Sequence, residues 1–395
     1  MTLSSRLELA QVKGVLQLYC RALSGTPLEV LDTQGLVQQN IGWVDEDAAS
    51  TDGTKVFLPP VVARYAETQH NFAWFKVVAT HQVAHVEFGS FAFRFETPST
   101  MFADRREQRE RDASQRLIAP NDSNGFGPMQ AYTEIGRFLR LFAHRRLAFD
   151  LFTILEDCRL DYRIAVEYPG IRRAASRVQS ESLSNRPKID TLPVQEALVE
   201  LLIHMSLEQF TSLPVPQVYG EAAMMLARIV HALRTPHATV EDAAEATLRA
   251  YEIISRIPND LQPVHQWQTR DLSKPGRFSE AAYEALIADL QARASAEESN
   301  PYDAPEPVDY RGDFKPEMVQ ILTQLQMDAN QPGEIESLSQ EMLEQALQES
   351  VELMGDADQD AIDMGALAQT LMQTNGTPAP QAQPEPGHKP QGSIR

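Results

Sequence analysis

Two long apolar segments with polar residues embedded in them constrain the fold of this chain more than any other feature. The first segment, from residue 61 to about 93, has so few polar positions that a helix there is expected to be buried. The second, from about 132 to 166, is an equally apolar run with acids inside it. Buried imidazoles and carboxylates need partners, so we expect the two sets of polar groups to be satisfied together. The embedded residues are His81, Gln82, His85, Glu156, Asp157 and Asp161.

The spacing of the two histidines points to a metal site. In the run THQVAHVEFG, His81 and His85 are four residues apart, which places them about 40° from each other around a helix. Both imidazoles can then reach one metal ion, as on the active helix of zincins, which also needs a third protein ligand and an open position for water. The sequence therefore makes His81 and His85 candidate zinc ligands.

The acidic cluster of the second segment, LEDCRLD, offers the third ligand. Zincins of the glutamate type take this ligand from a second helix, and an acid one turn further on orients a ligand histidine. Glu156 is the preferred ligand in this interpretation, with Asp157 close behind it. Asp157 as the ligand with Asp161 as the orienting acid is the alternative, because these two residues are one helical turn apart.

The residue after the first histidine distinguishes this segment from zinc peptidases. A peptidase needs Glu at that position, because its carboxylate takes the proton of the metal-bound water and passes it to the leaving group. Here the residue is Gln82, whose carboxamide cannot accept that proton near neutral pH. Glu87 lies about 160° around the helix from His85 and is badly placed to substitute. We therefore expect no efficient peptide hydrolysis.

A reading without metal competes with the zinc site. In that reading, His81 and His85 are core histidines whose rings hydrogen-bond to the acidic cluster. Arg159 and Arg163 lie in the same segment and would pair with the acids. The sequence leaves both readings open.

Composition excludes several classes of function. The chain has 35 basic and 55 acidic residues, a net charge of −20, which disfavours binding to nucleic acid or to an anionic membrane. It has no run long and apolar enough for a membrane span, no basic and apolar leader, and only two cysteines, Cys20 and Cys158, so we expect a cytoplasmic protein. The GxxxxGK[ST], GxSxG and GxGxxG motifs are absent. Asp356, Asp358 and Asp360 lack the glycine and glutamate of a calcium loop.

Hydrophobic periodicity predicts a mainly α protein with a small N-terminal β-sheet (α+β), in which a zincin-like helix pair precedes a helical array. A helix is expected over residues 3 to 23, ending at Gly25, and short strands near 28 to 31 and 55 to 58. The charged run ADRREQRERD is expected to be solvated. The array helices are expected at 194–210, 217–233, 239–256 and 278–296.

We expect four regions along the chain. A zincin-like domain spans 1–190 and a helical domain 191–299; an acidic linker with amphipathic helices, including 315–327 and 334–354, covers 300–374. Residues 375–395 are of low complexity and are expected to form a disordered tail. From residue 291 onward there are 19 acidic and 5 basic residues, so most of the net negative charge lies in this last part.

The motifs HQVAHVEFGSF and DLFTILEDCRLDYRI together resemble the NorD and CbbO family, whose members work with MoxR-type AAA+ ATPases. TDGTKVFLPP, HRRLAFDLF and PVDYRGDFKPEMVQIL agree with the resemblance, which covers about residues 20 to 355. Family members usually end in a von Willebrand factor A domain whose DxSxS loop helps to hold magnesium, and this sequence has no DxSxS. The resemblance thus implies a truncated or split member, or an A domain on a separate polypeptide.

The resemblance implies an adaptor that docks on a hexameric MoxR-type ATPase and directs the remodelling of a client enzyme. Relatives assist nitric oxide reductase or ribulose bisphosphate carboxylase, and no residue of this chain selects between such clients. The alternative is a zinc-dependent hydrolase of the metallopeptidase type, with the metal held by His81, His85 and Glu156. A purely structural scaffold is a third hypothesis.

Overall fold

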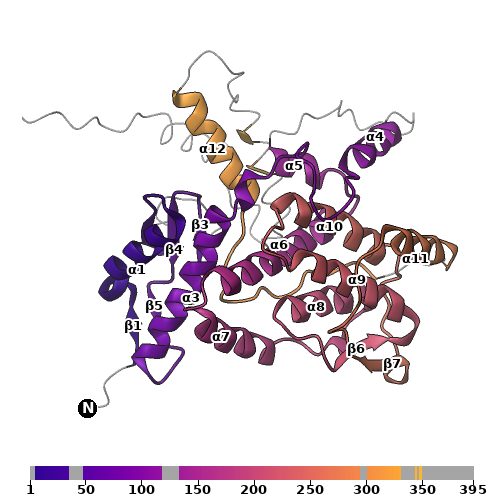
Figure 1. Cartoon of the computed structure of the whole chain (residues 1–395), viewed down its shortest axis with the longest axis horizontal. Helices are drawn as coiled ribbons and strands as arrows, with labels where there is room; N and C mark the ends of the chain where they lie inside the picture. The colour runs from indigo at the N-terminus through magenta and orange to yellow at the C-terminus, as the bar shows by residue number, and fades with distance from the viewer. Residues whose placement is uncertain are drawn as a thin grey trace, which may run out of the picture.

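The computed structural model describes residues 5–34, 48–117, 133–293 and 300–330, with the short pieces 343–344 and 347–348. Over these residues the protein is mainly helical with small sheets near its N-terminus, which confirms the expected fold class (Figure 1). The expected tail, the aspartates of the rejected calcium loop and nearly all of the 334–354 helix lie outside the described residues. No helix that the structure describes has the length and apolar character to cross a bilayer.

The N-terminal part combines helix α1 with short strands, but the helix expected from residue 3 begins only at Leu9, because Leu7 and Glu8 pair with Val61 and Val62 in a small sheet. Strand β1 (Leu7–Glu8) leads directly into α1 (Leu9–Ser24), which ends at Gly25 in the left-handed region, at φ 66°. Strand β4 pairs in parallel with β2 and antiparallel with β3, whereas β1 pairs antiparallel with β5. These four strands are β2 (Glu29–Asp32), β3 (Ser50–Thr51), β4 (Lys55–Leu58) and β5 (Val61–Val62).

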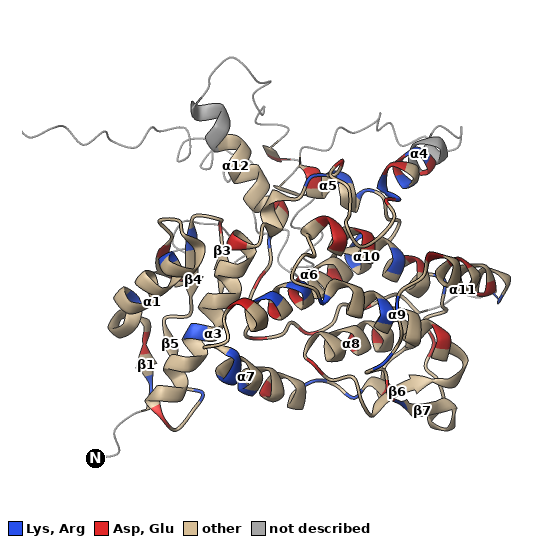
Figure 2. Cartoon of the chain, viewed as in Figure 1, with Lys and Arg blue, Asp and Glu red and all other residues tan. Residues whose placement is uncertain are grey.

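The first apolar segment forms α3 (Thr68–Glu87), which begins later than expected because Val61–Val62 pairs with β1 instead of joining the helix. Its middle is buried on all sides, from Val77 to His85, which is why it shows no amphipathic pattern. In Figure 2, α3 is drawn almost entirely in the colour of uncharged residues. A short 3-10 turn, η1 (Ser90–Ala92), follows it.

The second apolar segment is two helices, α5 (Glu134–Leu139) and α6 (Arg145–Glu167), and the single expected helix over 132–166 was wrong. The chain leaves the helix between them to make tertiary contacts. Phe142 packs edge-on against Tyr251 with ring centroids 4.7 Å apart, and the backbone N–H of His144 donates to the Tyr251 hydroxyl. These contacts outweigh the local helical pattern.

The helical array was expected at nearly the observed positions, with ends a few residues shorter. Thr239 caps α10 through a capping box with Asp242, as the sequence suggests. Helix α7 and the antiparallel pair of β6 and β7 were not expected. The elements are α7 (Arg172–Ser184), η2 (Ile189–Thr191), α8 (Val194–Ser206), β6 (Leu213–Pro216), η3 (Gln217–Tyr219), α9 (Gly220–Leu233), α10 (Val240–Ile254), η4 (Val264–Gln266), β7 (Trp267–Arg270), α11 (Glu280–Arg293) and α12 (Pro316–Asn330).

Hydrophobic packing is continuous across the described chain. One cluster of buried side chains runs from Leu7 to Tyr310 and takes in α1, α3, α6, α8 and α9. A second, rich in phenylalanine, joins α5 and α10 to Phe314. The expected boundary near residue 190 falls inside the first cluster, and the division into domains stays a prediction.

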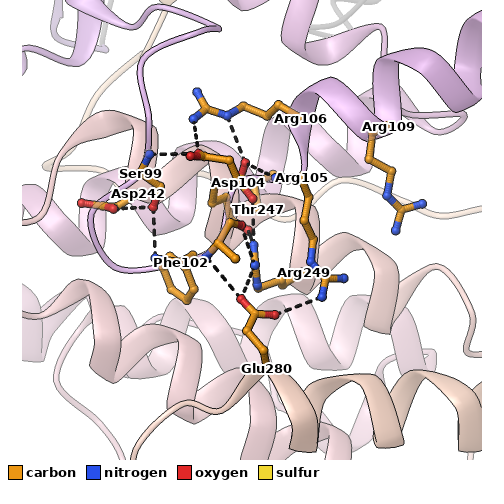
Figure 3. A network of polar contacts seen from close by, with 12 residues as sticks. Ser99, Phe102, Asp104, Arg105, Arg106, Arg109, Asp242, Thr247, Arg249 and Glu280 are labelled. Atoms are coloured by element: carbon orange, nitrogen blue, oxygen red, sulfur yellow. Dashed lines mark hydrogen bonds and ion pairs between the residues drawn. The ribbon is translucent and has the colours of Figure 1, made fainter.

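The charged run before and within α4 (Arg106–Leu117) is more buried than expected. Arg106 is 2% exposed and its Nε donates to Glu245 of α10. The segment is also fastened to the start of α10 through Asp242, which accepts hydrogen bonds from Ser99, Thr100 and Met101 (Figure 3). The solvated loop predicted for this run was therefore wrong for Arg106, because α10 supplies buried acids that the sequence could not place next to it.

Candidate metal centre

Three side chains from α3 and α6 converge in the core. Nitrogen and oxygen atoms of His81, His85 and Asp157 all lie within 4.8 Å of one another. Asp157 Oδ1 is 3.3 Å from His81 Nε2 and 3.8 Å from His85 Nε2. His81 and His85 are 1% exposed and Asp157 is 5% exposed, so the group is closed to bulk water.

Helical geometry explains why these residues meet. His81 and His85 are one turn apart on α3, and their rings lie edge to face with centroids 5.1 Å apart. Helix α6 packs against α3 and presents Asp157 to both rings, with Asp161 one turn further on. Both helices are buried along these faces, so the histidines of α3 and the aspartates of α6 have no access to bulk solvent there.

The outer ring nitrogen of each histidine is held by a neighbour. Asp161 Oδ1 lies 3.0 Å from His81 Nδ1. The hydroxyl of Ser90 donates to Glu156 and therefore accepts from Nδ1–H of His85, at 3.1 Å. Both arrangements direct the Nε2 atoms at the centre, as in metal sites whose ligand histidines are oriented by a carboxylate or hydroxyl.

The Nε2 atom of His85 is the clearest sign of a missing partner. With Nδ1 carrying the ring proton, Nε2 is a bare acceptor that is fully buried and has no hydrogen-bond partner among the described residues. A buried acceptor of this kind costs free energy unless something occupies the position in front of it. A metal ion held by two imidazoles and one carboxylate fits this donor set.

Glu156, the preferred third ligand of the sequence interpretation, lies elsewhere. It is fully buried in a two-pronged ion pair with Arg159, at 2.5 and 2.8 Å, and it accepts from Ser90. Consecutive helical residues point about 100° apart, so α6 can aim only one of Glu156 and Asp157 at α3. The structure thus places the alternative pair, Asp157 and Asp161, at the centre.

Of the two arginines expected to pair with the acidic cluster, Arg159 does so through Glu156 and Arg163 does not. Within the described part of the chain, neither contacts Asp157 or the histidines. Arg159 pairs with Glu156 and also donates to the carbonyls of Phe88 and Ala238. Arg163 pairs with Glu167 on the exposed side of α6. A different arginine, Arg311, takes the role of cationic partner: its Nη2 is 2.8 Å from Asp161 Oδ2 and its Nε is 3.8 Å from Asp157 Oδ2.

The two histidines differ in their electrostatics. Burial alone lowers the pKa of His81, but the carboxylates of Asp161 and Asp157 outweigh it and raise that pKa to about 9. Burial and the neighbouring charges of His81 and Arg159 hold the pKa of His85 well below its usual range. Without metal, a protonated His81 is thus satisfied by its two carboxylates, whereas His85 is neutral and its Nε2 stays unpartnered.

The segment Val308–Phe314, here called the strap, covers the centre. The Tyr310 hydroxyl donates to Asp161, and the Phe314 ring stacks on His85 with centroids 4.5 Å apart and planes 13° apart. Sequence reasoning missed this role, because a short irregular segment has no periodicity to reveal it. Its one signal was the mixture of aromatic, basic and glycine residues in DYRGDF.

Gln82 is tied to the strap. It is fully buried, and its Nε2 donates to the carbonyl of Arg311 at 2.6 Å. The position that carries the general base in a zinc peptidase therefore holds a main-chain contact in this protein.

Comparison of the chain with protein-family models, with curated proteins and with solved structures found no match. The resemblance to NorD and CbbO proteins therefore stays a prediction from sequence motifs. The geometry of the centre is independent of that resemblance, since it follows from the positions of α3, α6 and the strap.

Proposed function

We propose that this protein is a non-hydrolytic adaptor of a MoxR-type AAA+ ATPase and is built around a zinc centre held by His81, His85 and Asp157. The observation that carries the proposal is Gln82. At the position of the general base it presents a carboxamide, which cannot accept a proton near neutral pH and whose Nε2 donates to the carbonyl of Arg311 in the strap.

The donor set favours zinc. Two neutral imidazoles and one carboxylate are zinc ligands, and the contacts of Asp161 and Ser90 supply the outer support that such sites need. A bound zinc ion would be a Lewis acid and a strong cross-link between α3 and α6. The surrounding residues would use it mainly as a cross-link, because Phe314 and Arg311 close the centre.

The charge of the chain suits an adaptor. A protein of net charge −20, with much of it after residue 291, complements a basic surface on an ATPase hexamer. The client would be a metalloenzyme or carboxylase complex of the type that NorD and CbbO proteins serve, in the cytoplasm.

One observation favours the hydrolase alternative: two histidines and one carboxylate make three protein ligands, which is also the number of protein ligands in catalytic zinc sites. Gln82→Glu separates the two functions. A decayed or latent peptidase would gain slow cleavage of an unfolded protein substrate, whereas the adaptor gains none. The matched control is Gln179→Glu, a change of the same kind on α7 next to the strap.

The adaptor itself is tested with a purified MoxR-type ATPase. We expect the full chain to bind the hexamer and to raise its rate of ATP hydrolysis. Removal of the acidic residues from 331 onward should weaken this stimulation, and added salt should weaken it too, because both reduce the electrostatic attraction. Zinc-dependent cleavage of protein substrate by the wild-type chain, lost in His81→Ala, would contradict the proposal.

A further inference from the structure

The strap makes the contacts of a bound peptide. It reaches α3 through Gln82 and His85, α6 through Asp157 and Asp161, α7 through Gln179 and α8 through Ser206. Tyr310 is 1% exposed and Arg311 is 3% exposed, although neither belongs to a helix or strand. Two side chains of an irregular segment thus fill a site formed by α3, α6, α7 and α8. This site is here called the groove.

The main chain of the strap fits the groove as closely as its side chains do. The N–H of Arg311 donates to the carbonyl of Val308 at 2.9 Å, which closes a tight turn with Asp309 and Tyr310 at its tip. Gly312 follows in the left-handed region, at φ 67°. A Cβ there would lie 2.2 Å from the carbonyl oxygen of Ala49, so the position admits only glycine. The next N–H, of Asp313, donates to that same carbonyl at 2.7 Å.

Two cavities border the strap and are lined in part by its residues. A cavity of about 360 Å³ on one side is lined by Val61, Trp74 and Gly312, and a cavity of about 280 Å³ on the other reaches Thr153 and Asp157. The indole N–H of Trp74 and the hydroxyl of Thr153 are buried and have no partner among the described residues. Space and unused polar groups on both sides are typical of a site that accepts other ligands.

The charge of the groove specifies what it accepts. In the metal-free protein, His81 is one cationic partner of Asp157 and Asp161. Arg311 of the strap supplies the second cation that two buried carboxylates need. An occupant that replaces the strap in the metal-free protein must therefore bring a guanidinium or ammonium group. The strap itself contains no helix or strand, and it leads directly into α12.

We propose that the groove is a peptide-binding site that the strap occupies in cis, and that it takes a partner's turn-forming peptide of the same Tyr-Arg-Gly chemistry when the strap leaves. This inference goes beyond the adaptor role and requires neither metal nor ATPase. It provides a specific way for the adaptor to hold a protein partner.

The test uses the full chain with Gly312→Val, which cannot keep the strap against Ala49, and a fluorescent peptide of residues 305–316 as the probe. Gly276→Val is the matched control, because Gly276 is also left-handed, at φ 83°, but has nothing within 4 Å of a Cβ. Binding is measured by polarisation in EDTA without ATPase, so a failure here is independent of the zinc centre and of the adaptor role.

We expect the Gly312→Val chain to bind the peptide at least about tenfold more tightly than wild type or the control, because only its groove is open. A peptide with Gln in place of the arginine should not bind. Trypsin should cut Gly312→Val after Arg311 while Arg159 and Arg249, both fully buried, stay intact. Cutting at Arg311 without peptide binding, or no cutting at Arg311, would overturn the proposal.

A second variant covers the case in which Gly312→Val does not fold. Arg311→Gln removes the cation of the strap and leaves its backbone conformation unstrained. We expect faster hydrogen exchange of the strap amides and peptide binding above the wild-type level. If hydrogen exchange of the strap amides is unchanged and the peptide does not bind to this variant, the proposal is equally refuted.

Discussion

At the scale of single residues, the account depends on which acid of α6 faces the histidines. Glu156 and Asp157 are neighbours of similar chemistry, yet one is neutralised by Arg159 and the other lies between His81 and His85. Asp161 then orients His81 and holds Arg311. A one-residue step along a helix thus separates a structural ion pair from a candidate ligand.

Paired conservative substitutions test this assignment. Asp157→Asn should abolish tight zinc binding, because an amide oxygen is a much weaker ligand than a carboxylate. Glu156→Gln should keep zinc but destabilise the fold by about 3 kcal/mol or more, since it leaves the buried Arg159 without its ionic partner. Zinc titration and urea unfolding of both proteins give the comparison. Retained zinc in Asp157→Asn together with loss in Glu156→Gln would restore the original preference for Glu156.

At the scale of elements, buried polar contacts fix how irregular segments join helices. Asp242 at the start of α10 accepts from the backbone N–H groups of Thr100, Met101 and Thr239 and from the Ser99 hydroxyl. Figure 3 shows Asp242 next to Ser99, with the ion pairs of Arg249 and Glu280 beside it. The strap is fixed on α3 and α6 by the same kind of contact.

Asp242→Ala should therefore cost about 3 kcal/mol or more in the free energy of unfolding, because several donors lose one shared, fully buried acceptor. Asp52→Ala is the control. Asp52 also accepts backbone N–H groups, from Thr54 and Lys55, but in a half-exposed turn, and its loss should cost about 1 kcal/mol. If the two variants lose equal free energy of unfolding in urea, burial of the acceptor does not matter here.

Sequence reasoning predicted the regular elements far better than the contacts between them. Helices such as α8 to α11 follow from apolar spacing and caps, and the convergence of His81 and His85 follows from helical geometry. The break before α6 depends on Tyr251, more than 100 residues away in sequence. The strap was missed for the same reason: its contacts join distant parts of the chain, and local pattern carries no information about them.

At the scale of the whole molecule, ion pairs connect α4, α10 and α11 around Glu252. Burial raises the pKa of Glu252, but Arg256, Tyr283 and Arg109 outweigh it and lower that pKa to about 2. A carboxyl whose pKa is lower in the folded state stabilises the protein fully above its unfolded pKa. That contribution is lost as the pH falls from about 4.5 toward 2.

Glu252→Gln should consequently flatten the dependence of stability on pH in this window, and the two proteins should differ most near neutral pH. Thermal unfolding midpoints measured from pH 7 down to pH 3 provide the check. If the unfolding midpoints of wild type and variant change with pH in parallel, Glu252 does not contribute to acid unfolding.

The candidate zinc centre is also a whole-molecule feature, because its residues join α3 of the N-terminal part to α6 at the middle of the helical array (Figure 1). The most direct test is elemental analysis of the purified full chain beside the double variant His81→Ala/His85→Ala, with unfolding midpoints measured before and after EDTA. The account predicts about one equivalent of zinc, lost in the variant, and a lower midpoint after EDTA. A wild-type chain that is free of metal, folded and insensitive to EDTA would contradict it.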